Sequence, residues 1–151
     1  MQYVRLIKPE WFNHVRNEFG DLSFVKSTKD DSGMSIFELE SLTVGIAAHV
    51  SEYYPDFLVN GRVIFSVLRE HEFPSNYVLK SVDDPDPFHR GLDAIVEGGA
   101  FIKNKHFKAH FREKRASLNE FAICEADGSI RAIEPADIAE WARLKAQADE
   151  S

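Results

Sequence analysis

The spacing of hydrophobic residues along the chain predicts a mixture of strands and helices. Several short segments are apolar throughout or alternate between apolar and polar residues, as strands do. We predict strands over residues 3–7, 22–25, 35–39, 57–59, 77–82, 92–96, 121–125 and 129–133. In other segments the apolar residues recur every three or four positions, which places them on one face of a helix. We predict helices over residues 9–19, 42–53, 64–71, 103–117 and 136–149.

Turn-forming residues divide these segments. Residues 26–33 are polar and predict a loop, and Asn60-Gly61 is a strong turn dipeptide. Asp127-Gly128 joins two predicted strands into a hairpin. Because strands and helices alternate irregularly, a doubly wound parallel sheet is disfavoured. We expect a single α+β domain over residues 1–151, with a mixed or mainly antiparallel sheet, three to five helices and a C-terminal helix near 136–149.

The composition predicts a globular protein with an aromatic core. Hydrophobic residues make up 44% of the chain and charged residues 28%, and phenylalanine alone occurs 12 times. This balance is typical of folded domains rather than disordered chains. The residues on the apolar faces of the predicted elements should be buried: Trp11, Phe12, Phe19, Ile95, Phe121, Ile123 and Trp141.

The sequence also excludes several settings. It contains no run of about 18 apolar residues, so we expect no contact with a membrane. The first residues lack the long apolar stretch of a signal peptide. A single cysteine, Cys124, excludes an internal disulfide and fits a reducing compartment, where we expect it to be a small core residue. We therefore expect a cytoplasmic protein.

Three short segments and two further residues form a pattern that resembles a known group of proteins. They are Arg5–Phe12, Gly33–Ile36 and Asp84–Pro87, followed by His89 and Gly98. The pattern is similar to that of small uncharacterised bacterial proteins of this length. The resemblance carries no activity and implies only a bacterial, cytoplasmic setting.

The positive charge of the chain is concentrated in the predicted helix 103–117. The formal net charge is −7, yet residues 100–116 contain six Lys or Arg and one Glu. Phe107, Phe111 and Leu118 form the apolar stripe of this helix, so its cations should face outward. We expect these cations to be the binding residues: Lys105, Lys108, Arg112 and Arg115.

The same helix offers a metal site as an alternative. His106, His110 and Glu113 lie at positions i, i+4 and i+7, so that one helix face presents all three. Two imidazoles and a carboxylate can ligate zinc, with His89 or Cys124 completing the set. The other interpretation is that both histidines flank the apolar stripe. We favour it, because the pair lacks the glutamate of an HExxH motif, and we expect no metal and no cofactor.

Other motifs of hydrolytic enzymes are incomplete. Asp84, Asp86, Asp93 and Glu97 resemble the first half of a PD-(D/E)xK nuclease site, in which carboxylates hold a divalent metal. The lysine that should follow two residues after Glu97 is replaced by glycine. We therefore interpret residues 83–87 as a structured turn. No serine lies in a GxSxG motif, and no phosphate-binding loop is present.

These observations favour binding over catalysis. We expect a small bacterial interaction protein, accessory or inhibitory, that binds a protein partner through charge-complementary surfaces. The alternative is a nucleic-acid-binding module or a metal-dependent phosphodiesterase centred on the basic helix 103–115. Salt-sensitive retention on heparin or RNA would favour the alternative.

Overall fold

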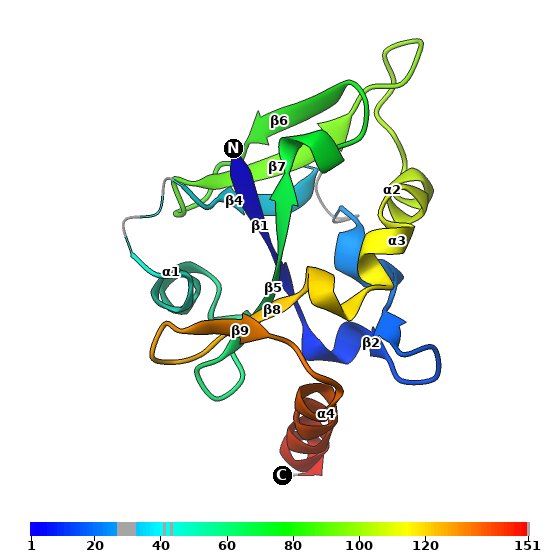
Figure 1. Ribbon diagram of the computed structural model, residues 1–151. Coiled ribbons are helices and arrows are strands. Elements are labelled where there is room, and N and C mark those ends of the chain that lie inside the picture. The colour runs from blue at the N-terminus through cyan, green and yellow to red at the C-terminus, as the bar shows by residue number, and fades with distance from the viewer. Residues whose placement is uncertain (27–32, 41, 43, 151) are drawn as a thin grey trace.

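The computed structural model describes residues 1–26, 33–40, 42 and 44–150, and its centre is a twisted antiparallel sheet (Figure 1). The sheet has seven strands in the order β6-β7-β4-β1-β5-β8-β9. Their bounds in that order are Tyr77–Ser81, His89–Ala94, Met34–Glu38, Gln2–Ile7, Val63–Arg69, Ala122–Cys124 and Ile130–Ala132. A separate hairpin pairs β2 (Phe12–Asn13) with β3 (Glu18–Phe19).

Four α-helices are found in the described part of the chain. They are α1 (Ile46–Tyr53), α2 (Asn104–His110), α3 (Arg112–Arg115) and α4 (Pro135–Glu150). Short 3-10 turns connect the strands and helices, at Pro9–Trp11, Asp21–Phe24, Pro55–Phe57, Glu70–Glu72 and Leu118–Glu120. The predicted α+β class with a mainly antiparallel sheet is therefore confirmed.

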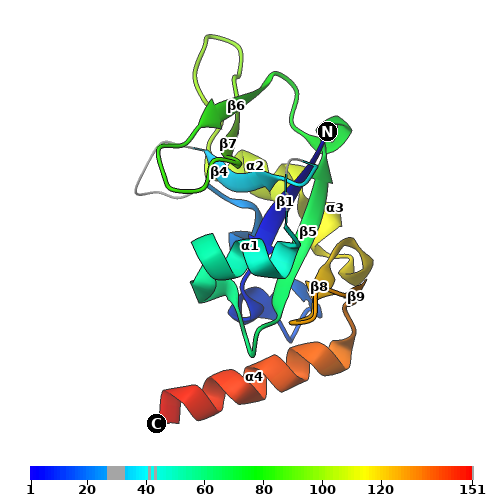
Figure 2. The ribbon, with the colours of Figure 1, turned by 90° about the vertical axis from the view of Figure 1, so that its left-hand side faces the viewer.

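The sheet is covered on both faces. Helix α1 lies on one side, and α2 and α3 lie on the other, as two perpendicular views show (Figures 1 and 2). Alternate residues of β4 divide between the two faces: Met34 and Ile36 join the aromatic core under α2 and α3, whereas Phe37 joins the smaller core under α1. Cys124 is buried in this smaller core, as predicted.

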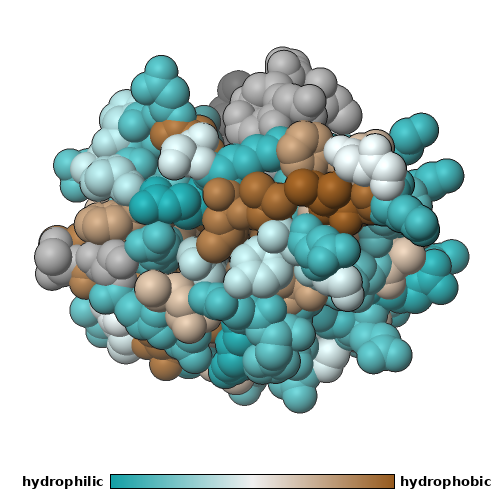
Figure 3. Space-filling view, turned by 90° about the horizontal axis from the view of Figure 1, so that it is seen from above, coloured by the Kyte–Doolittle hydropathy of each residue, from teal (hydrophilic) through white to brown (hydrophobic). Residues whose placement is uncertain are grey.

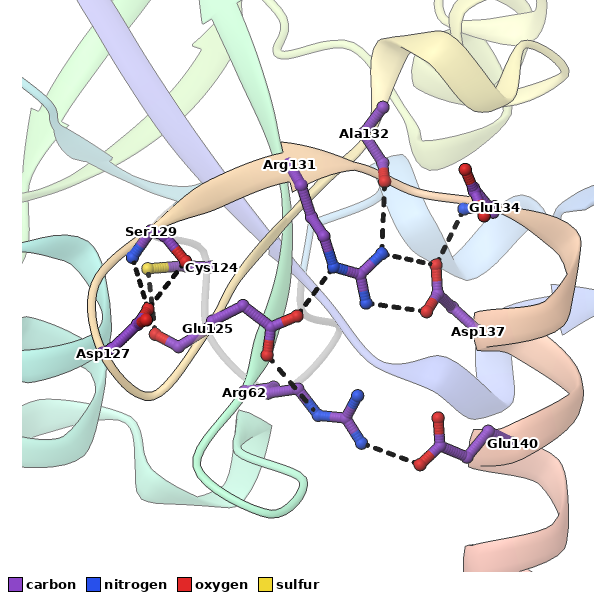
Figure 4. Close-up of polar contacts among 10 residues, drawn as sticks. All are labelled: Arg62, Cys124, Glu125, Asp127, Ser129, Arg131, Ala132, Glu134, Asp137 and Glu140. Atoms are coloured by element: carbon purple, nitrogen blue, oxygen red, sulfur yellow. Dashed lines mark hydrogen bonds and ion pairs between the residues drawn. The ribbon is translucent and has the colours of Figure 1, made fainter.

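Helix α4 crosses the end of the sheet beneath the β8–β9 hairpin and is fastened to it by ion pairs (Figure 4). Arg131 of β9 donates to both carboxylate oxygens of Asp137, at 2.8 and 2.7 Å, and to Glu125 at 2.7 Å. The hydrogen bonds from Arg131 hold the pKa of Asp137 below its usual value. Trp141 then buries its ring against the aromatic core. The predicted hairpin and C-terminal helix are both confirmed.

The predicted helix over residues 9–19 is wrong. The segment is a 3-10 turn followed by the β2–β3 hairpin, in which Phe12 pairs directly with Phe19. The Asn13 side chain accepts hydrogen bonds from the amides of Val15 and Arg16, and Asn17 takes a positive φ of 56°. Val15 at the turn is 96% exposed. Two phenylalanines seven residues apart share a face in a helix, but a hairpin of this length also brings them together.

Residues 64–71, predicted as a helix, mostly belong to the central strand β5. Ile64 and Leu68 are buried against one core, and Val63 and Phe65 against the other. A strand that is buried on both faces has a continuous apolar run, which also contains helical spacings.

Three other predicted elements are shorter or different in the structure. Residues 22–25 lie mainly in a 3-10 turn, and in the segment 57–59 only Val59 makes a β-bridge, with Arg62. The predicted helix over 42–53 begins only at Ile46. The predicted polar loop over 26–33 falls largely on residues 27–32, which lie outside the described residues.

The surface seen from above, over the β6–β7 end of the molecule, carries a stripe of hydrophobic residues among hydrophilic ones (Figure 3). Exposed apolar side chains at this end include Ile95, Val96 and Phe101. The predicted burial of Ile95 is therefore wrong: it is 37% exposed, because it lies beyond the end of β7. Trp11 is only half-buried, and the other five residues predicted to be buried are in the core. None of the described helices has both the length and the apolar character needed to cross a membrane.

Candidate active site

Ser35 and His89 lie side by side on the face of the sheet that carries α1. In the β4–β7 register, Ser35 is opposite Gly91 and Phe37 is opposite His89, so Ser35 and His89 are diagonal neighbours on one face. The Ser35 Oγ atom lies 2.5 Å from Nε2 of His89. The side chain of Ser35 is exposed because Met34 and Ile36, its neighbours in the strand, turn to the opposite face.

The carboxylate of Asp84 binds the other nitrogen of the same imidazole. Oδ2 of Asp84 makes a close hydrogen bond with Nδ1 of His89. A carboxylate can only accept, so this contact places a proton on Nδ1 and leaves Nε2 of the neutral ring to accept from the Ser35 hydroxyl. Oδ1 of Asp84 accepts the amide of Asp86 at 2.9 Å, which fixes the orientation of the carboxylate. The three side chains form a hydroxyl–imidazole–carboxylate chain.

A second aspartate anchors the turn that carries Asp84. Asp86 is 2% exposed, and its carboxylate accepts the amide of Phe88 and Nε2 of His49, each at 2.9 Å. It also accepts a close hydrogen bond from the hydroxyl of Tyr54. His49 lies in α1 and Tyr54 directly follows it, so the buried carboxylate fastens the turn to this helix.

These contacts determine the protonation of the buried groups. Burial raises the pKa of Asp86, but the hydrogen bonds from Tyr54, Phe88 and His49 outweigh burial and leave the pKa below its usual value. Burial and the adjacent Asp86 raise the pKa of Tyr54 far above neutral pH. Asp86 is therefore an ionised acceptor and Tyr54 a neutral donor, and both keep these protonation states at physiological pH.

Ser35 and His89 open into a pocket of about 500 Å³. Such a volume suits a small organic ligand. The pocket lies between the sheet, the Pro9–Trp11 turn and the Pro55–Phe57 turn. Its described lining residues are Arg5, Lys8, Trp11, Leu22, Val25, Lys26, Gly33, Ser35, Phe57, Val82, His89 and Gly91. Three of them are cations and none is a carboxylate.

Arg5 lies where β1 and β4 separate. The two strands pair at Tyr3–Glu38 and Val4–Phe37. At the next position the Arg5 side chain, in place of backbone pairing, forms a hydrogen bond with β4. Its guanidinium donates to the carbonyl oxygens of Ser35 and Ser23, both at 2.9 Å, and of Val25 at 3.2 Å. Burial lowers the pKa of Arg5 to about 10, which still leaves it charged at neutral pH. Among the described residues no carboxylate pairs with it.

The predicted basic helix differs from expectation in shape and in charge. Phe111 interrupts it with φ −99° and ψ 16°, which separates α2 from α3. Lys105 and Arg112 are exposed and Lys108 is half-buried. Arg115 is not an outward charge, since it is 9% exposed and forms an ion pair with Asp21. These helices therefore carry fewer exposed cations than expected. Binding of a protein partner through charge complementarity stays a prediction.

The candidate metal ligands of this helix have other contacts. Nδ1 of His106 accepts the amide of Lys103, and Nε2 of His110 donates to the carbonyl oxygen of Glu72 at 2.6 Å. Glu113 is exposed nearby. Within the described part, no group of three or more His, Cys, Asp or Glu side chains is arranged to hold a metal ion. The apolar stripe is confirmed at Phe107 and Phe111, which are buried.

Ser35 was not identified from the sequence as a functional residue. The pattern around it contains a signal, since Ser35 is a polar residue between the apolar Met34 and Ile36. His89 was considered only as a possible additional metal ligand. Comparisons of the chain with protein-family models, with curated proteins and with solved structures find no match. The function is therefore inferred from the geometry of the site.

Proposed function

We propose that the protein is a serine hydrolase that cleaves an ester bond, with Ser35 as the nucleophile and His89 as the general base. The observation that supports this proposal is the hydrogen-bonded chain from Ser35 through His89 to Asp84. An imidazole held between a hydroxyl and a carboxylate in this order can take the hydroxyl proton, while the carboxylate stabilises the imidazolium that forms. This series of hydrogen bonds ends with Ser35 at the wall of a pocket, where a substrate has access to the hydroxyl.

The reaction follows from these roles. Ser35 Oγ attacks the carbonyl carbon of the ester as its proton passes to Nε2 of His89. The tetrahedral intermediate then collapses, the bond to the alcohol oxygen breaks, and His89 returns the proton to that oxygen. Water attacks the resulting acyl-serine while His89 takes a proton from it. Collapse releases the carboxylic acid, and the proton on His89 returns to Ser35.

The surroundings of Ser35 favour this reaction. Gly91, the residue opposite Ser35, has no side chain and leaves room above the hydroxyl for a carbonyl group. The tetrahedral intermediate carries a negative charge on oxygen, and fixed positive charge near that atom lowers the barrier. Lys8 and Lys26 line the same pocket. Asp84 acts through His89 and is a positioning residue.

A covalent probe tests the nucleophile directly. A fluorophosphonate should label Ser35, as located by peptide mass spectrometry, and Ser35→Ala should abolish both labelling and hydrolysis of 4-nitrophenyl acetate. Ser129→Ala is the matched control, because the Ser129 hydroxyl donates to the carboxylate of Asp127, at 2.6 Å, and has no histidine partner. Labelling elsewhere, or hydrolysis that survives in Ser35→Ala, would refute the proposal.

Asp84→Asn tests the hydrogen-bonded chain. The neutral amide can hold the imidazole but does not stabilise its charged form, so kcat should fall by about 100-fold or more. KM should change little, because Asp84 does not line the pocket. A purely structural role would instead lower stability and reduce the active fraction without a fall in the rate per active site.

A further inference from the structure

The pocket beside Ser35 has the opposite charge to the protein as a whole. The formal net charge of the chain is −7, but the described lining of the pocket contains Arg5, Lys8 and Lys26 and no carboxylate. Charges more than about 8–10 Å away are largely screened at physiological salt. A ligand inside the pocket therefore experiences the nearby cations more strongly than the acidic surface.

Two of these cations are available to an anion. The Lys8 ammonium has no acidic partner among the described residues and lies 5.3 Å from the centre of the Phe57 ring. Arg5 gives three N–H groups to carbonyl oxygens, and a guanidinium has five, so N–H donors remain on a side chain that lines the pocket. Lys26 also lines the pocket but already pairs with the buried Asp93 at 3.3 Å.

Aromatic rings form another part of the wall. Trp11 and Phe57 meet edge to face with their centres 6.3 Å apart, and the Arg5 guanidinium lies 5.8 Å from the centre of the Trp11 ring. Both rings are only half-buried. Partly exposed rings next to unpaired cations provide stacking for a flat group and ion pairing for an anion.

We infer that the substrate is an ester that carries a phosphate or carboxylate group together with a flat ring, bound with its anion at Lys8 and Arg5 and its ring against Trp11 and Phe57. This inference rests on the proposed hydrolase function, because it places the ester carbonyl at Ser35 in the same pocket. The anion-binding part is independent of catalysis and can be measured without it.

Quenching of tryptophan fluorescence measures binding. The chain has two tryptophans, and Trp141 is buried, so an added ligand that quenches should do so at Trp11. Phenyl phosphate and benzoate should quench at concentrations at least tenfold lower than neutral benzamide. Of these two anions, the one that quenches at the lower concentration is the one that the site prefers. Lys8→Glu should weaken both anions at least tenfold. Lys105→Glu, the same charge change at an exposed position outside the pocket, should leave them unchanged.

Hydrolysis tests the substrate class. The wild-type protein should cleave 4-nitrophenyl hydrogen succinate at least tenfold more efficiently than 4-nitrophenyl acetate, and Lys8→Glu should bring the ratio of the two efficiencies down to about one. Equal rates on both esters together with equal binding of benzamide and phenyl phosphate would overturn the inference and leave the hydrolase proposal standing. Anion binding that depends on Lys8 without any esterase activity would overturn the hydrolase proposal and support the anion site alone.

Discussion

Replacement of the buried Asp86 by asparagine tests whether one carboxylate holds the turn at the candidate active site. In the wild-type protein Oδ2 of Asp86 accepts from both His49 and Tyr54, and Oδ1 accepts from the amide of Phe88. Asparagine has nearly the same shape but keeps only one acceptor oxygen. If that oxygen stays with the amide of Phe88, an NH2 group faces two donors.

The expected loss of stability follows from this count. A buried donor left without an acceptor costs about 1–3 kcal/mol. Two such donors, His49 and Tyr54, are affected at a site that is 2% exposed. Together the two unpaired donors amount to about 2–6 kcal/mol. We therefore expect Asp86→Asn to lower the free energy of unfolding by about 2–6 kcal/mol at pH 7.

The pH dependence gives a second test. The folded-state pKa of Asp86 is lowered relative to the unfolded chain, so its contribution to stability is complete above the unfolded pKa, about 4, and is lost as the pH falls through the lower folded value. The difference in stability between wild type and Asp86→Asn should be constant from pH 8 to pH 5 and should shrink below about pH 4.

Urea denaturation followed by far-UV circular dichroism measures the effect. Asp86→Asn should shift the midpoint without a change in slope. Asp83→Asn is the matched control, because Asp83 lies in the same turn and is exposed. Its stability should stay within about 0.5 kcal/mol of the wild type. If both variants are equally stable, the network of Asp86 does not hold the turn and its role in positioning His89 is refuted.

Three further substitutions test backbone strain and core packing. Gly33→Ala should cost about 1–3 kcal/mol in urea denaturation, because Gly33 has φ +89° and a new Cβ would lie 2.7 Å from the carbonyl oxygen of Leu92. Gly98→Ala, with φ +94° and no atom within 4 Å, isolates the backbone strain and should cost less. Trp141→Ala should cost about 3–5 kcal/mol, because its ring is buried against the aromatic core. An unchanged melting temperature for Trp141→Ala would show that α4 does not contribute to that core.

The fold could be predicted from the sequence where the local pattern had only one solution. The Asp127-Gly128 pair predicts the β8–β9 hairpin because it suits a type I′ turn, and in the structure Gly128 takes φ +91°. The prediction of a helix over 64–71 is wrong, because a strand with both faces buried lacks the alternation that distinguishes it from a helix. Its environment is created by β1 and β8, which are distant in sequence.

The candidate site was harder to predict because its parts meet only through strand register. Ser35 and His89 are 54 residues apart, and their contact depends on the pairing of Phe37 with His89. A shift of one residue in that register would turn one of the two side chains to the opposite face of the sheet. The sequence identified the acidic turn at residues 83–87 as a structured turn, but it could not show which aspartate faced inward.

The proposed role of the turn depends on a division between its two aspartates. Asp86 faces inward, where His49 of α1 and Tyr54, the residue after α1, are its donors, and the hydrogen bond that it accepts from the amide of Phe88 sets the direction of the backbone. Asp84 faces outward and reaches His89 because its other oxygen holds the amide of Asp86. The ionised Asp86 thus stabilises the turn from which Asp84 binds His89. A structural turn and a catalytic role are therefore compatible interpretations of the same residues, since the buried carboxylate provides the rigidity that the exposed one needs.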